Sequence, residues 1–224
     1  MIFATDIFNE SFISKENEIP ILVIENKKMY QNFIFELISE LNGIESEHNF
    51  FIDDKQLNLR KDLELILDMF TLDINKSKNI TKLYNYIKSE YINNEKLMQT
   101  TQLSVKIIEY IQDITNEIDF DLTFETNIDL QAILKAVDLK FYYDDSTLLE
   151  KLIDYIKITH DFLGKKFFII LNLKTIFSSQ EQQQFYEFLM YNKIEILLVE
   201  TSQQSKKLEN EIYRIIDDDL CVIY

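Results

Sequence analysis

Apolar residues near the start of the chain follow first the spacing of a strand and then that of a helix. Residues 21–25 (ILVIE) form a short apolar run, as expected for a central strand covered on both faces. From Tyr30 to Leu41 apolar residues recur every three or four positions, which predicts a helix over about 27–42 that ends at Gly43. The first 13 residues predict a short hairpin or edge strand, and residues 49–54 (NFFIDD) predict a second strand.

The middle of the chain, from about 60 to 118, shows helical spacing alone. Three apolar stripes repeat at three and four residues, which is typical of antiparallel helices that bury their stripes against each other. This region is therefore predicted to be all-helical. The three stripes are Leu63, Ile66, Leu67 and Phe70; Ile80, Leu83, Tyr84, Ile87 and Tyr91; and Leu103, Ile107, Ile111, Ile114 and Ile118.

Strands and helices alternate again toward the C-terminus. The pattern predicts a helix over about 146–163 ending at Gly164, a strand at 167–172, a helix over about 179–191, a strand at 195–200, a helix over about 206–216 and a strand at 221–224. This alternation indicates right-handed crossovers and a mostly parallel sheet. We therefore predict an α/β domain formed by residues 1–58 and 140–224, with an inserted helical domain at 59–139.

The turn after the first predicted central strand, residues 25–28 (ENKK), contains no glycine. A Walker-type loop needs glycines, because its backbone N–H groups must converge on a phosphate. The turn after the predicted strand at 167–172 offers Lys174 and Thr175 but again no glycine. With two glycines in the whole chain, neither a Walker loop nor a dinucleotide fingerprint can form, so a bound nucleotide is not expected.

Signatures of nucleophilic catalysis are also missing. His48, in a predicted loop, and His160, on a predicted helix, lie far apart in the sequence, and there is no G-x-S-x-G motif. The single cysteine, Cys221, falls in a predicted apolar strand, where a buried, inert thiol is expected. We therefore expect no catalytic residue.

The number of cysteines and the N-terminal residues indicate the cellular compartment of the protein. One cysteine cannot form an internal disulfide, which favours a reducing cytoplasm. The N-terminal residues carry acids and lack a basic segment followed by an apolar one, so they do not form a signal peptide. No apolar run reaches the length of about 18 residues that a membrane helix needs.

The formal net charge of −16 argues, taken alone, against nucleic acid, because DNA binding draws on phosphate neutralisation by Lys and Arg. Binding nevertheless depends on local fields rather than on the sum. Basic residues form four adjacent pairs, which are either dispersed surface lysines or parts of a cationic surface. The pairs are Lys27-Lys28, Arg60-Lys61, Lys165-Lys166 and Lys206-Lys207.

Residues 117–125 (EIDFDLTFE) alternate polar and apolar side chains. If the segment is extended, Glu117, Asp119, Asp121 and Glu125 share one face and repel each other unless a cation intervenes. Oxygen-only ligands suit Ca²⁺ better than Mg²⁺ when the geometry is loose. Two other readings stay open: a strand with a solvated acidic face, or a preceding helix that continues to about residue 118.

Taken in order, these features resemble the Csn-two family of subtype II-A CRISPR–Cas systems, in its short form. The resemblance covers nearly the whole chain and rests on ordered blocks rather than on one signature. The blocks are the strand ILVIE (21–25), the helical insertion, the segment NEIDFDLTFE (116–125) leading into a short helix, KKFFIILNL (165–173) and EILLVE (195–200).

The resemblance implies an α/β head with a degenerate P-loop-ATPase-like core and a helical leg. It also implies a non-catalytic, ring-shaped homotetramer that binds Ca²⁺ and encircles double-stranded DNA, loading at free ends without sequence specificity. Its expected role is spacer acquisition beside the integrase proteins and the effector nuclease of the same locus. On this basis the calcium ligands would be Glu117, Asp119, Asp121 and Glu125. We predict that Lys27 and Lys28 line the hole and contact DNA, and that Lys165, Lys166, Arg60 and Lys61 are further candidate contacts.

Two alternatives remain at this stage. The carboxylates of 117–125 could serve a metal-dependent nuclease with Mg²⁺, which would need a basic or water-positioning partner that the sequence does not reveal. The chain could also be a protein-only scaffold that never touches DNA.

Overall fold

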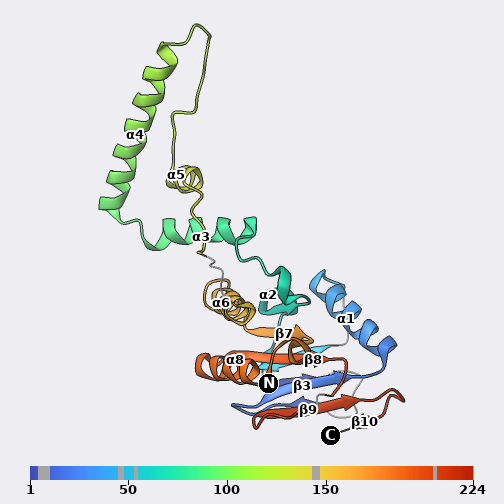
Figure 1. Ribbon diagram of the computed structural model, residues 1–224. Coiled ribbons are helices and arrows are strands. Elements are labelled where there is room, and N and C mark those ends of the chain that lie inside the picture. The colour runs from blue at the N-terminus through green and yellow to red at the C-terminus, as the bar shows by residue number, and fades with distance from the viewer. Residues whose placement is uncertain (5–10, 45–47, 53–54, 143–146, 204–205, 224) are drawn as a thin grey trace. The chain divides into compact units, whose positions relative to one another are not determined.

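The computed structural model describes residues 1–4, 11–44, 48–52, 55–142, 147–203 and 206–223, apart from the side chain of residue 94. The chain divides into two compact units (Figure 1). Unit 1 comprises Met1–Leu72 and Asp145–Tyr224, and unit 2 comprises Asp73–Asp144. Parts of the segments predicted at the N-terminal hairpin, at 49–54, at 146–163 and at 221–224 fall outside the described residues.

Unit 1 is built on a six-stranded sheet with the order β10-β9-β3-β8-β7-β6. Five neighbouring strands are parallel, and β10 runs antiparallel to β9 at one edge. The prediction of an α/β fold is therefore confirmed. The strands are β3 (Ile19–Ile24), β6 (Leu63–Ile66), β7 (Phe167–Leu171), β8 (Glu195–Glu200), β9 (Glu211–Ile216) and β10 (Val222–Ile223).

A second, four-stranded antiparallel sheet, with the order β2-β1-β4-β5, completes the strands of unit 1. The predicted N-terminal hairpin is confirmed, since Phe3 of β1 pairs with Phe12 of β2. The Phe3 and Phe50 rings stack with their centroids 4.3 Å apart. The strands of this sheet are β1 (Ile2–Ala4), β2 (Phe12–Ile13), β4 (Asn49–Ile52) and β5 (Lys55–Gln56).

The core of unit 1 lies on both faces of the larger sheet. All six residues of β3 are buried, as the apolar run predicted. On one face, Leu22 and Ile24 pack in a cluster with Phe33 and Leu37 of α1 and with Phe50 of the smaller sheet. Because side chains alternate along a strand, the remaining residues of β3, β7 and β8 face the opposite side, toward α6 and α8.

The helices of unit 1 have strong local start signals. Thr147 and Glu150 form a capping box at the start of α6, and Ser178 and Glu181 form another at the start of α8. Each box satisfies backbone N–H groups that have no partner inside the helix. The helices are α1 (Lys27–Leu41), α2 (Leu59–Asp62), the 3-10 helix η1 (Met69–Thr71), α6 (Leu148–Asp161), α7 (Leu173–Ile176) and α8 (Ser179–Asn192).

Two helix predictions were wrong. Residues 63–66 form β6, paired with β7, and residues 211–216 form β9, paired with β3 over six positions. In both segments apolar residues happen to fall three and four apart, as Ile212, Ile215 and Ile216 do. Short apolar runs of this kind are ambiguous by periodicity, and pairing with a buried parallel strand decides for the strand.

Unit 2 is formed by α3 (Ser77–Glu90), α4 (Asn94–Asn116), α5 (Leu130–Ala136) and the irregular segments around them. The buried Tyr84 of α3 donates a hydrogen bond of 3.0 Å to the carbonyl of Leu139. The Asn75 side chain both donates to the Phe141 carbonyl, at 3.1 Å, and accepts from the Phe141 N–H, at 2.9 Å. These bonds hold the returning chain against the start of the unit.

Candidate nucleic-acid interface

The turn that follows β3 is a capped helix start rather than a phosphate cradle. The Asn26 side chain accepts a hydrogen bond from the Met29 N–H at 3.0 Å and donates one to the Asp218 carbonyl at 2.9 Å. Asn26 therefore caps the N-terminus of α1 and links the helix to the turn between β9 and β10. The glycine-free junction noted in the sequence thus has a structural purpose.

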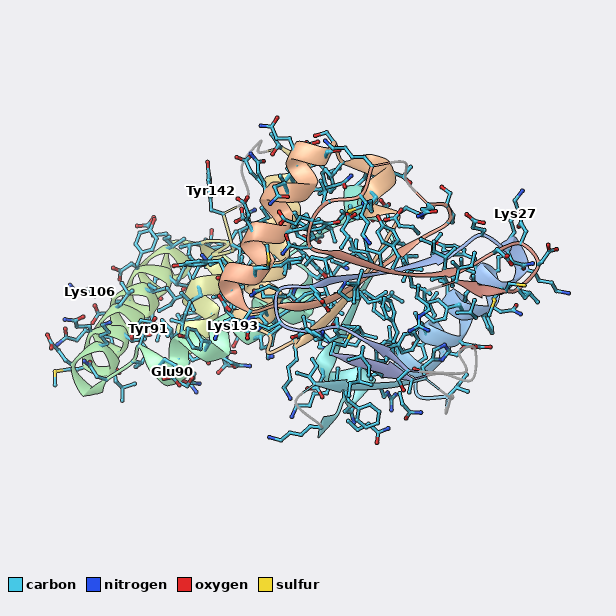
Figure 2. The ribbon with its side chains drawn as sticks, turned by 90° about the horizontal axis from the view of Figure 1, so that it is seen from below. Lys27, Glu90, Tyr91, Lys106, Tyr142 and Lys193 are labelled. Atoms are coloured by element: carbon cyan, nitrogen blue, oxygen red, sulfur yellow. The ribbon has the colours of Figure 1, made fainter. Side chains whose placement is uncertain are left out.

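Lys27 and Lys28 are the first two residues of α1 and are exposed. Figure 2 shows the Lys27 side chain projecting outward from the start of the helix. No acidic residue lies in that first turn, although Glu25 precedes it and the turn that contains Asp218 adjoins its cap. The start of a helix carries partial positive charge, so the two lysines and the helix end together favour an anion at this corner.

The structure brings two further basic pairs together, although they lie about a hundred residues apart in the sequence. Because β6 and β7 are neighbours, Arg60-Lys61 and Lys165-Lys166 meet at the amino ends of these strands. The Lys165 Nζ donates to the Arg60 carbonyl at 3.2 Å, and the Lys166 N–H donates to the Asp62 carbonyl at 2.8 Å. We call Arg60, Lys61, Lys165 and Lys166 the β6–β7 corner.

The four side chains of the β6–β7 corner are not equally available. The Lys165 Nζ also donates to the Leu63 carbonyl at 2.5 Å, so much of its hydrogen-bonding capacity is used inside the fold. Lys61 is exposed, and the Lys166 side chain is 60% exposed although it lies 3.0 Å from Asp62. Burial alone would raise the pKa of Asp62, but the hydrogen bonds from Lys166 and the Asn58 N–H lower it.

Arg60 connects this corner to the C-terminal end of α1. Its Nη2 donates to the Asn42 carbonyl at 3.3 Å, where a cation is favoured by the helix dipole. Gly43 is needed beside it for two reasons. Its φ of +92° is a backbone conformation that glycine adopts without strain and other residues rarely adopt. In addition, a Cβ at that position would clash with the Arg60 Cζ, which would lie only 2.7 Å away.

The acidic segment 117–125 does not form a strand, and the preceding helix ends close to residue 118, as one of the readings of the sequence expected. α4 ends at Asn116, and residues 121–129 have no regular secondary structure. Glu117, Asp119, Asp121 and Glu125 are all exposed. Within the described ranges no three His, Cys, Asp or Glu side chains lie close enough together to share an ion.

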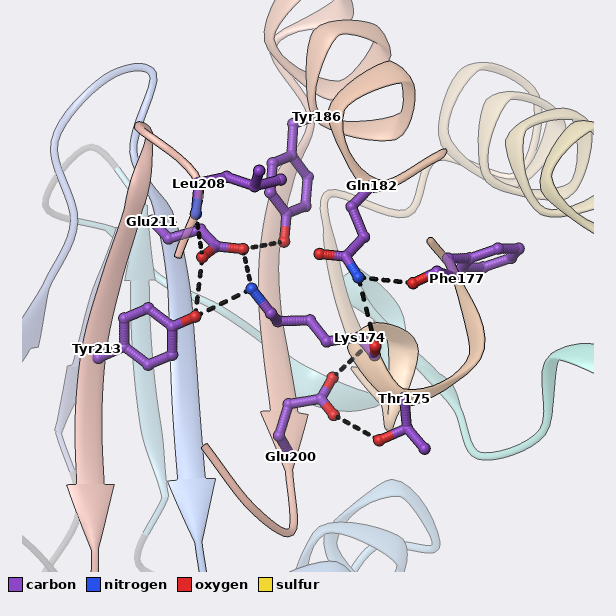
Figure 3. Close-up of polar contacts among 9 residues, drawn as sticks. All are labelled: Lys174, Thr175, Phe177, Gln182, Tyr186, Glu200, Leu208, Glu211 and Tyr213. Atoms are coloured by element: carbon purple, nitrogen blue, oxygen red, sulfur yellow. Dashed lines mark hydrogen bonds and ion pairs between the residues drawn. The ribbon is translucent and has the colours of Figure 1, made fainter. Parts of the chain in front are cut away.

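A buried polar network that the sequence did not reveal extends from the carboxyl ends of β7 and β8 to the first residue of β9 (Figure 3). The Lys174 Nζ forms an ion pair with Glu211 and donates to the Tyr213 hydroxyl at 2.9 Å. The Tyr186 hydroxyl of α8 donates to Glu211 at 2.8 Å. Lys174 and Glu211 are almost fully buried, so each charge needs the other.

Glu200, at the end of β8, extends this network. Its carboxylate accepts from the Lys174 N–H at 2.8 Å and from the Thr175 hydroxyl at 3.5 Å. Burial nonetheless raises its pKa to about 7. Burial also raises the pKa values of Tyr186 and Tyr213, with Glu211 adding to the effect. In the sequence, this network was indicated only by three charged residues within apolar segments, namely Lys174, Glu200 and Glu211.

Two histidines and the cysteine complete the account of candidate chemistry. The His48 ring lies 3.0 Å from a Glu40 oxygen, stacks parallel to the Phe3 ring and meets the Phe33 ring edge to face. His160 lies on α6, as predicted, with its Nδ1 2.8 Å from Asp161. The prediction of a buried Cys221 was wrong: the residue is exposed in the turn before β10, where its N–H donates to Asp217.

Within the described part of the chain, no helix combines the length and apolar character that crossing a bilayer requires.

Comparison with known proteins gives two consistent matches. The family model described as CRISPR-associated protein (Cas_Csn2) matches residues 43–220. The chain is also similar to the CRISPR-associated protein Csn2 of Enterococcus faecalis, with 24% identity over 220 residues. That alignment covers 96% of this chain and 97% of the relative. The similarity therefore extends through both units and includes the β6–β7 corner.

Proposed function

The chain belongs to the Csn2 family of CRISPR-associated proteins, and on this premise we propose that it binds double-stranded DNA ends, without sequence specificity, during spacer acquisition. The observation that carries the proposal is the presence of two cationic corners on an acidic protein. One is Lys27-Lys28 at the start of α1, and the other is the β6–β7 corner at its end. Its partners would be the integrase proteins and the effector nuclease of the same locus.

The two corners suit a duplex by their separation. α1 has 15 residues and so spans about 22 Å at 1.5 Å per residue. With about 3.4 Å between successive phosphates of a strand along the helix axis, this distance covers roughly six phosphates. Contacts of this kind to the backbone carry no sequence information, and their strength falls as salt rises.

We propose that unit 1 is a degenerate P-loop-ATPase-like head without catalytic activity. In open parallel sheets, ligands bind outside the carboxyl ends of the strands. Here the Asn172 amide after β7 donates to the Tyr30 hydroxyl at 3.3 Å, and Glu200 lies at the end of β8. Neither the turn after β3 nor the turn after β7 has a glycine that would let backbone N–H groups converge on a phosphate, which supports the loss of ATPase activity.

We also propose that the chain forms a ring-shaped homotetramer in which unit 2 is the leg. Support comes from apolar side chains that α4 and the following segment leave uncovered. A groove of about 340 Å³ between α4 and residues 126–130 adds to this surface. Exposed apolar surface of this extent marks an interaction site. The exposed residues include Leu97, Met98, Leu103, Val105, Ile114, Ile118, Phe120 and Leu122.

We propose that calcium binds between two copies of the chain rather than within one. Since Glu117, Asp119, Asp121 and Glu125 do not converge within one chain, they would fit Ca²⁺ only if a second copy supplied further oxygen ligands. Calcium would then offset carboxylate repulsion between copies. The same lack of convergence gives no support to a nuclease built on these residues.

Gel-shift titrations with matched linear and covalently closed duplexes test the proposed function. We expect the linear form to bind and the closed form to bind at least about tenfold more weakly, because a ring must load at an end. Raising salt from 50 to 200 mM should weaken binding to the linear form steeply. Equal affinity for both topologies would contradict end loading.

Charge reversal tests the proposed contact residues. Lys27→Glu with Lys28→Glu should abolish binding and leave the oligomer intact. Lys135→Glu with Lys140→Glu is the matched control, because it makes the same change in net charge at exposed positions of unit 2. Equal loss of affinity in both variants would show that only the total charge matters.

A further inference from the structure

Charge is divided unevenly along unit 2. Residues 74–106 contain six lysines and two glutamates, a net charge of +4 in a protein of −16. Residues 107–129 contain seven acids and no basic residue. The cationic part consists of α3, the corner after it and the first half of α4, whereas the anionic part begins in the second half of α4. Unit 2 therefore has a local cationic surface that the net charge conceals.

Two of the three lysines of α3, Lys78 and Lys82, lie on its solvent face, whereas Lys88 lies 3.8 Å from Asp129. Ile80, Leu83, Tyr84 and Ile87 form the covered stripe of the helix, and Tyr84 is buried. Lys78, Lys82 and Tyr86 follow one another at intervals of four residues on the other side and are all exposed. Residues four apart are neighbours along a helix, about 6 Å apart in rise. Their side chains thus form a row along the helix.

The row continues around the corner between α3 and α4. The Tyr86 and Tyr91 rings meet edge to face with their centroids 5.7 Å apart. The Lys96 Nζ lies 6.0 Å from the centre of the Tyr91 ring, within the range of a cation–π contact. Figure 2 shows Tyr91, with Glu90, on the surface at this corner. We call Lys78, Lys82, Tyr86, Tyr91 and Lys96 the α3 row.

We propose that the α3 row is a second contact for the phosphate backbone of duplex DNA, separate from the two corners of unit 1. The proposal rests on the proposed function only in that the chain must bind duplex DNA at all. It assigns the lysines to phosphates as charge partners and the Tyr91 hydroxyl, to which Tyr86 is hydrogen-bonded, as a hydrogen-bond donor. Each copy of the chain would then hold DNA through both units.

The composition of this face favours phosphate over an acidic protein. Besides the row itself, the face carries Asn85 and Ser89, and none of these residues is aliphatic. Lys, Ser, Asn and Tyr are the side chains that commonly donate to phosphate oxygens. Tyr86 and Tyr91 would also suit a protein interface, but lysine is depleted at the centres of such interfaces. Glu90 and Glu95 sit at the corner and reduce the field there without cancelling it.

The test compares three double variants in the full-length chain, by fluorescence titration with linear duplex at several salt concentrations. Lys78→Glu with Lys82→Glu should weaken binding at least about tenfold and reduce the slope of log K against log salt by about 2, one unit for each lost phosphate contact. The control pair Lys135→Glu and Lys140→Glu should change affinity less than about twofold. Lys27→Glu with Lys28→Glu reports on the proposed function itself.

The outcomes separate the two proposals. If Lys78→Glu with Lys82→Glu matches the control while Lys27→Glu with Lys28→Glu abolishes binding, the α3 row is not a contact and the proposed function stands. If the wild-type chain does not bind linear duplex, the proposed function fails and this inference fails with it.

Lysine acetylation of the wild-type chain provides a readout that needs no variant. Mass spectrometry should show Lys78 and Lys82 protected from acetylation at least about threefold by saturating DNA, with Lys135 and Lys140 unprotected. Equal reactivity of Lys78 and Lys82 with and without DNA would overturn the assignment, even if the double variant failed to fold.

Discussion

The two units use similar apolar residues in opposite ways. In unit 1, β3 is buried along its whole length and Leu197 of β8 is fully inaccessible. In unit 2, α4 has 23 residues, yet the one residue of it that is buried in the described structure is Ser104. Ile114 is 41% exposed and Phe120 is 77% exposed. Unit 1 buries its apolar side chains within one chain, whereas unit 2 leaves many of its apolar side chains exposed.

The comparison teaches where stability and assembly come from. Burial of apolar area contributes about 25 cal/mol per Å², and unit 1 gains nearly all of it within one chain. Unit 2 leaves much of that free energy unused within one chain. Core substitutions should therefore affect folding in unit 1, and matched substitutions should affect association in unit 2.

The largest expected effect is in the core of unit 1. Phe167→Ala removes a fully buried ring from the centre of the sheet and should cost about 3–5 kcal/mol of unfolding free energy. Leu103→Ala on α4 should cost less than about 1 kcal/mol in dilute, monomeric protein, because Leu103 is exposed. Urea denaturation measures both. A comparable loss for Leu103→Ala would mean that α4 is already covered within one chain.

A buried carboxylate is the expected weak point of the same core. Burial raises the pKa of Glu200 from 4.5 to about 7, so the folded state holds a proton that the unfolded state releases. Stability should fall as pH rises from about 4.5 to 7, by up to roughly 3 kcal/mol at 1.36 kcal/mol per pKa unit. Glu200→Gln should flatten this dependence and be the more stable form at pH 8. Parallel stability–pH curves for the two proteins would contradict the assignment.

Association through unit 2 should respond to exposed apolar residues. Phe120→Ser with Leu122→Ser should raise the dissociation concentration of the oligomer at least about tenfold, and leave the urea midpoint of unit 1 unchanged. Val137→Ser, also at an exposed position of unit 2, is the control. Sedimentation velocity over a dilution series measures the change. An unaffected oligomer would place the interface elsewhere.

The smallest effect concerns a local start signal. Thr147→Ala removes the hydroxyl that caps α6 and should cost about 1 kcal/mol. Thr147→Ser keeps the oxygen and should restore most of the loss. Thermal unfolding followed by circular dichroism distinguishes the two, and equal melting temperatures would show that the cap contributes nothing.

Much of the fold could be predicted from the sequence because its strongest signals are local. The run ILVIE, the helix after it and the segments 167–171, 179–192 and 195–200 appear where periodicity placed them. Residues 63–66 and 211–216 could not be assigned that way, because a neighbouring buried strand overrides a weak helical pattern. The exposure of Cys221 could not be predicted, because its apolar neighbours in the sequence indicated a buried strand.

The site was less accessible to sequence reasoning because its parts are distant in the chain. The pairing of β6 with β7 brings Arg60 and Lys165 together, and no local sequence pattern predicts this pairing. The ion pair between Lys174 and Glu211 likewise joins α7, the short helix after β7, to the first residue of β9. Charge pairs of this kind follow from topology, which the basic pairs in the sequence did not specify.

The central claim is that unit 2 leaves its apolar surface open for further copies of the same chain. Multi-angle light scattering at tens of micromolar protein, with calcium and then with a chelator, tests it most directly. One chain has a mass of 26.9 kDa, so the account predicts about four times that mass with calcium and a looser or smaller species with the chelator. A single-chain mass under both conditions would contradict it.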